Sequence, residues 1–205
     1  EADPRDAQKQ RDLMVSHFKL GEVQVQLGKY DAAIERFQRG MAVVDTMIEQ
    51  NLLVESAANE KEVLEQRLQF CQRATLAIGD WETVLKADAK FLPELLSVRV
   101  TLLAPRGRLA DVAQAGAKLR ELEPKTNSNF YSAACAYGLC AAIVVKDKPE
   151  PTDIERAEEK KYLDLSLACL KEAIAAGYNN FDHMRHDTNL TPLHTLPEFE
   201  ALFPK

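Results

Sequence analysis

The sequence is poor in the residues that interrupt helices, and it lacks the alternation that builds sheets. Its 205 residues include only eight glycines and nine prolines, most of them where a helix would begin or end. No segment alternates apolar and polar residues over the length of a strand, which is the pattern of a half-buried β-strand. We therefore predict an all-α fold and exclude sheet-based architectures.

Basic clusters and long apolar runs are missing as well. The net charge is −6, and no run of lysine and arginine offers the positive patch that nucleic acids require. The longest apolar run, around 141–145, is far shorter than the roughly 20 residues that span a bilayer. The chain begins Glu-Ala-Asp-Pro, with neither a methionine nor a secretory signal. We expect a fragment or processed chain of a cytoplasmic protein, with no membrane and no nucleic-acid partner.

Catalytic and cofactor motifs are also absent from the sequence. It has no glycine-rich phosphate loop, no nucleophile elbow and no paired acid and base carboxylates. The four cysteines show no metal-type spacing and stand among apolar or small residues: Cys71, Cys135, Cys140 and Cys169. This setting predicts reduced, buried thiols. We therefore expect no enzyme activity in the chain itself and no cofactor.

One polar cluster leaves a metal site open as an alternative. His183 and His186 stand three residues apart, and Asp187 or His194 could complete a ligand set. No HExxH motif accompanies them. We favour a polar cap at this place and expect no metal, with a metal-binding helical protein using His183 and His186 as the less favoured alternative.

Helical periodicity fills the rest of the chain. Apolar residues recur at helical spacing, and short turns joining the segments predict antiparallel pairs. The eight expected helices, in four pairs, cover residues 5–27 with 30–50, 55–77 with 82–91, 93–103 with 109–121, and 127–145 with 153–176. Thr152 and Glu155 have the spacing of a capping box before the last of these.

Two glycines stand in the first expected helix pair, at positions where glycine is unfavourable. A glycine in a helix interior costs about 1 kcal/mol relative to alanine, yet Gly21 and Gly28 both stand in good helix sequence. We expect Gly21 to let the second helix approach closely and Gly28 to supply a left-handed turn.

The spacing around these glycines resembles the tetratricopeptide repeat. The first match is carried by Leu20-Gly21, Gly28-Lys29-Tyr30, Ala33 and Phe37; weaker ones are carried by Gly79-Asp80-Trp81, Gly107-Arg108-Leu109 and 133–137. Gln24 and Gly40 depart from the pattern, which usually has an aromatic residue and an alanine there. The resemblance implies a right-handed α–α superhelix, a solenoid of about four helix pairs over residues 1–178. Residues 179–205 would form a capping segment of the same domain. An unrelated helical bundle is the alternative.

A narrower resemblance concerns the runs 129–137, 173–178 and 187–193, and the opening 11–16. These runs look like the C-terminal repeat region of large serine/threonine protein kinases from planctomycete-type bacteria. The resemblance implies a regulatory or scaffolding module beside a kinase domain. The chain itself has no kinase glycine-rich loop, no His-Arg-Asp and no Asp-Phe-Gly.

The repeat resemblance also indicates a binding face, because the first helices of the pairs line a groove in such solenoids. The residues expected there are Val15, Phe18, Lys19, Glu22, Val25, Gln26, Glu94, Ser97, Val98 and Thr101. The basic and asparagine clamp of chaperone-binding relatives is missing, so we do not predict binding of chaperone tails. We expect a non-catalytic interaction or scaffolding module that binds a protein, a peptide or another domain of its parent chain. The alternatives are a structural spacer or dimerisation segment and a closed helical bundle that binds a ligand.

Overall fold

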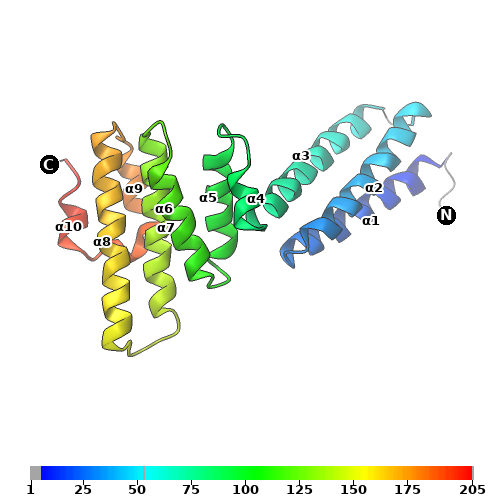
Figure 1. Ribbon diagram of the computed structural model, residues 1–205. Coiled ribbons are helices and arrows are strands. Elements are labelled where there is room, and N and C mark those ends of the chain that lie inside the picture. Colours follow the sequence, from blue (N-terminus) through cyan, green and yellow to red (C-terminus); the bar gives the residue numbers. More distant parts are fainter. Residues whose placement is uncertain (1–5, 53, 205) are drawn as a thin grey trace. The chain divides into compact units, whose positions relative to one another are not determined.

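Every regular element that the structure describes is helical. This computed structural model describes residues 6–52 and 54–204, and no strand occurs among them. The elements are α1 (Ala7–Gln26), α2 (Tyr30–Glu49), α3 (Val54–Ile78), α4 (Trp81–Leu85), α5 (Leu92–Leu103), α6 (Leu109–Glu121), α7 (Asn127–Val145), α8 (Asp153–Ala175), α9 (Phe181–His186), the 3₁₀ helix η1 (Thr188–Leu193) and α10 (Pro197–Glu200) (Figure 1). The all-α prediction is confirmed.

The chain divides into two compact units, Glu1–Leu76 and Ala77–Lys205. Unit 1 contains α1, α2 and nearly all of α3. Unit 2 contains the remaining helices together with the tail after residue 178, where η1 packs against α7 and α8.

In unit 1, α1 and α2 form the antiparallel pair expected around the two glycines (Figure 1). A Cβ atom at Gly21 would lie 2.5 Å from the fully buried Phe37 ring of α2, so a larger residue at this crossing would force the ring to shift. Gly28 has a φ of 69°, a left-handed conformation that side chains disfavour. Both reasons expected for the glycines are thus confirmed.

Side chains of α3 complete the core of unit 1. Leu64, Cys71 and Ala74 of α3 are fully buried or nearly so, and the Phe70 ring meets Tyr30 of α2 edge-on at 6.2 Å. The ammonium of Lys61 pairs with Asp45 of α2 at 2.6 Å. α3 is therefore packed against the α1–α2 pair and does not extend alone from it.

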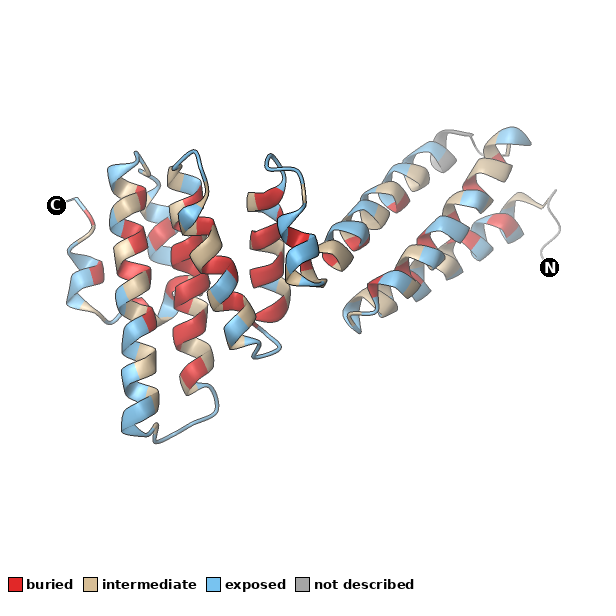
Figure 2. Cartoon of the chain, in the orientation of Figure 1, coloured by how far each residue is buried: buried red, intermediate tan, exposed pale blue. Residues whose placement is uncertain are grey.

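In unit 2, α7 is the central helix. It packs against α6 and α8, and η1 lies against it as well. Figure 2 shows buried residues along most of its length. Among the described residues, α7 is the one helix long and apolar enough to cross a membrane, but 67% of its apolar window is buried inside the unit. Its apolar character is therefore accounted for by its place in the core.

The expected helix over 82–91 is wrong in its length. α4 ends at Leu85, and the following segment is a series of turns. The Asp88 carboxylate accepts a hydrogen bond from the Lys90 N–H at 2.9 Å, a local contact that competes with helix. Because α4 packs against α5, the second of the four expected pairs is not a hairpin of two long helices.

The capping box before α8 is confirmed and gives a pH-dependent prediction. The Thr152 N–H donates to Glu155 at 2.7 Å, and the Glu155 N–H donates to the Thr152 hydroxyl at 3.3 Å. The neighbouring Lys148 ammonium, at 2.7 Å, and then the Thr152 N–H lower the pKa of Glu155 to about 2.

We expect Glu155→Gln to destabilise the protein at neutral pH but not in strong acid. The native pKa lies below the unfolded value of about 4.5, so the charge stabilises the fold above that value. This contribution is lost as the pH falls from about 4.5 towards about 2. Glutamine keeps the capping bonds but removes the charge. Urea denaturation at several pH values measures the difference, with the exposed loop variant Glu150→Gln as control. A difference independent of pH would contradict the assignment.

Candidate functional site

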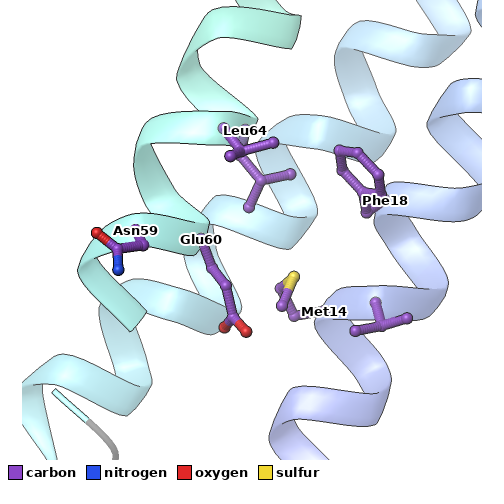
Figure 3. Close-up of a pocket in the computed structure, with 7 residues that line it drawn as sticks. Met14, Phe18, Asn59, Glu60 and Leu64 are labelled. Atoms are coloured by element: carbon purple, nitrogen blue, oxygen red, sulfur yellow. The ribbon is translucent and has the colours of Figure 1, made fainter. Parts of the chain in front are cut away.

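An apolar groove of about 280 Å³ lies between α1 and α3 in unit 1. Its lining comes from both helices: Met14, Val15, Phe18, Asn59, Glu60, Val63 and Leu64. Figure 3 shows Met14 and Phe18 on the α1 wall, with Asn59, Glu60 and Leu64 on the α3 wall. Aliphatic and aromatic side chains dominate the lining, so the groove suits an apolar group of a partner.

Two ion pairs join the same two helices. Arg11 meets Glu60 at 2.9 Å, and Arg67 meets Glu22 at 2.9 Å. Partly exposed pairs of this kind contribute at most about 1 kcal/mol each. Their main effect is to fix the register of α1 against α3, and hence the shape of the groove.

Of the six groove residues expected on α1, two line the groove and four do not. Val15 and Phe18 line the groove. Glu22 is paired with Arg67, while Val25 is half-buried outside the lining. Lys19 and Gln26 are exposed on α1 and do not line the groove. The residues of the α3 wall were not expected from the sequence.

A second groove, of about 430 Å³, lies between α5 and α7 in unit 2. Its lining residues are Thr101, Ala104, Pro105, Leu139, Ala142, Ile143, Lys146 and Asn189. Of the four groove residues expected on α5, only Thr101 is among them. Ser97 donates its hydroxyl to the Pro93 carbonyl at 2.9 Å, Val98 is half-buried, and Glu94 is exposed.

The histidines near the tail turn to three different partners. His183 Nε2 lies 3.7 Å from the Asp187 carboxylate, and His186 Nδ1 lies 2.8 Å from the Asp182 carbonyl. The His194 ring packs on Phe199 with 5.3 Å between centroids. Among the side chains that the structure describes, no three of His, Cys, Asp or Glu are arranged to hold a metal ion.

Asp187 is instead the centre of a buried polar cluster that attaches the tail to α7. Its carboxylate accepts hydrogen bonds from the Tyr131 hydroxyl at 2.8 Å, the Cys135 thiol at 3.4 Å and the Asn189 N–H at 2.9 Å. The Tyr131 ring stacks on Tyr178 at 4.4 Å. Burial raises the pKa of both Tyr131 and Cys135, so both groups stay protonated and unreactive.

The other cysteines are equally unsuited to chemistry. All four are free and buried, as expected. Burial raises the pKa of Cys71 and of Cys169 to about 11, and that of Cys140 to about 12. A thiol is nucleophilic only as the thiolate, so the grooves, and not the cysteines, are the candidate sites.

Comparison of the chain with protein-family models, with curated proteins and with solved structures gives no match in any of the three.

Proposed function

We propose that the chain is a non-catalytic protein-interaction module built from tetratricopeptide-like helix pairs. A solenoid of such pairs would bind apolar segments of a partner protein, or of its own parent chain, along the first helices of the pairs.

The observation that carries the proposal is the position of the two grooves. In unit 1 the groove lies between α1 and α3, and in unit 2 it lies between α5 and α7. In the expected pairing these are the first helices of successive pairs. In each unit a groove therefore opens on the helices that the repeat resemblance assigns to binding. The buried, protonated thiols and the tail cluster offer no competing reactive centre.

Acidic substitutions in the unit 1 groove test the proposal. We expect the double variant Val15→Glu and Val63→Glu to retain a captured partner about tenfold less than the unaltered chain, because two charges would have to be desolvated. Val63 is 46% exposed, so the fold tolerates the change there. Immobilised protein and lysate of the native host provide the assay, and circular dichroism confirms that the variant is folded.

The control carries the same added charge elsewhere in unit 1. Gln38→Glu with Ala42→Glu alters exposed positions of α2 outside the groove and should retain the partner as the unaltered chain does. Equal retention by the groove variant would refute the role of the groove. Self-association without any captured protein would favour the dimerisation segment instead.

A further inference from the structure

Helix α1 presents a second apolar surface that is separate from the groove. We call it the α1 stripe: Leu13, Leu20, Val23 and Leu27, which are 36%, 48%, 51% and 63% exposed. Leu13, Leu20 and Leu27 are spaced seven residues apart and Val23 lies between two of them, so all four share one face over about 21 Å. Half of the eight large apolar side chains that the described residues expose are in this stripe.

The stripe and the groove lie on different sides of α1. Met14 and Gly21, which face the core, are buried, and Phe18 of the groove packs toward Phe37. At helical spacing the stripe points away from these residues. Large apolar side chains gathered in this way on an exposed face mark an interaction surface.

Basic residues border the stripe on both sides. Lys19 is on one flank of α1 at helical spacing, and His17 is on the other, towards α2. A Cβ atom at Gly40 of α2 would lie 3.7 Å from the Cβ of His17, so Arg39, next to Gly40, and Arg36, one turn earlier, belong to the part of α2 that lies beside His17. Burial, and then the guanidinium groups of these two arginines, lower the pKa of His17. Within the described residues, none of Lys19, Arg36 and Arg39 takes part in an ion pair.

Within the described part of the chain, no acid of α1 or α2 forms an ion pair with these cations. Asp12 is the acid of α1 beside Leu13, and its carboxylate accepts a hydrogen bond from the Gln8 side chain at 2.9 Å. Asp31, at the start of α2, accepts from Thr75 of α3 at 3.2 Å. The stripe thus combines an apolar centre with unpaired cations at its borders.

We infer that the α1 stripe is a docking surface for an acidic amphipathic helix of a partner protein. The partner would place leucine-like residues at three- and four-residue spacing on the stripe and carboxylates against Lys19, Arg36 and Arg39. A second copy of this chain fits less well. Its own stripe would bring a second set of the same cations to the interface, and like charges would repel each other there.

Two designed peptides test the inference directly. Each has about 20 residues with the same leucine positions, and they differ only in flanks of glutamate or of lysine. By fluorescence anisotropy, we expect the glutamate peptide to bind with a micromolar dissociation constant, and to bind more weakly as salt is added. The lysine peptide should bind at least about tenfold more weakly. Equal binding of the two peptides, or no binding of the glutamate peptide, would overturn the inference.

Variants assign the binding to the stripe and separate it from the groove. Leu20→Ser with Leu27→Ser should weaken binding of the glutamate peptide about tenfold or more, and Arg36→Glu with Arg39→Glu should reverse the preference between the peptides. The groove variant Val63→Ser should bind as the unaltered chain does, so failure of the proposed function leaves this test intact. Binding unaffected by the stripe variants would overturn the inference. Self-association abolished by Leu20→Ser would overturn it too, because a second copy would then cover the stripe.

Discussion

Replacing Arg99 with methionine is expected to lower the free energy of unfolding by about 3 to 5 kcal/mol, the cost of removing one partner from a buried charged cluster. The Arg99 side chain is only 5% exposed. Methionine would preserve most of its apolar volume but none of its hydrogen bonds, so the loss reports on those bonds.

Arg99 joins three segments of unit 2. Its guanidinium donates to the carbonyls of Ala77 and Gly79 at 2.8 and 2.9 Å, where α3 ends, and to the Asp111 carboxylate of α6 at 2.7 Å. The same group lies over the Trp81 ring, 5.5 Å from its centroid. Without Arg99, two carbonyls and part of a carboxylate would lose their hydrogen-bond partner, and each such buried group costs about 1 to 3 kcal/mol.

Urea denaturation followed by the fluorescence of Trp81, the only tryptophan, measures the effect. Arg106→Met is the control, since Arg106 is exposed and should change stability by no more than about 0.5 kcal/mol. The Arg99→Lys variant should recover only part of the lost free energy of unfolding, because a lysine ammonium cannot reproduce the planar array of N–H donors of the guanidinium. A methionine variant within about 1 kcal/mol of the unaltered protein would show that these bonds contribute little.

The positions of most helices were predictable from the sequence, because glycine and proline residues mark where the helices begin and end. α6 and α7 have the predicted limits, with a left-handed Gly107 before the first and Pro124 between the two. The end of α4 was not predictable by periodicity. It depends on a side-chain contact of Asp88 and on packing of α4 against α5, which the apolar pattern does not encode.

The candidate groove was predictable only on one wall. Val15 and Phe18 follow from the face that a first helix presents, whereas Asn59 and Val63 enter the lining through the crossing of α3 over α1. That crossing is a tertiary contact between residues more than forty positions apart. Arg99 illustrates the same limit, because its partners Ala77 and Asp111 come from other segments.

The structure, and not the sequence, explains why a glycine, Gly138, stands in the middle of α7. A Cβ atom there would collide with the backbone carbonyl oxygen of Asn189, in η1. The η1 segment cannot easily retreat, because Leu190 and Leu193 are fully buried and the Asn189 N–H is bonded to Asp187. The glycine thus provides the space in which the tail packs on the central helix.

We therefore expect Gly138→Ala to destabilise the protein by about 1 to 2 kcal/mol. The collision with backbone puts the cost of overpacking in the upper part of its usual range, at about 2 to 3 kcal/mol, and the helix propensity of alanine offsets about 1 kcal/mol of it. The opposite sign of these terms makes the test decisive. Gly107→Ala is the comparison: its φ of 68° strains a side chain, but nothing lies within 4 Å, so about 1 kcal/mol should be lost there without repacking. Hydrogen exchange should then be faster in η1 for Gly138→Ala and unchanged there for Gly107→Ala. A stabilised Gly138→Ala variant would show that η1 does not pack against α7 at this position.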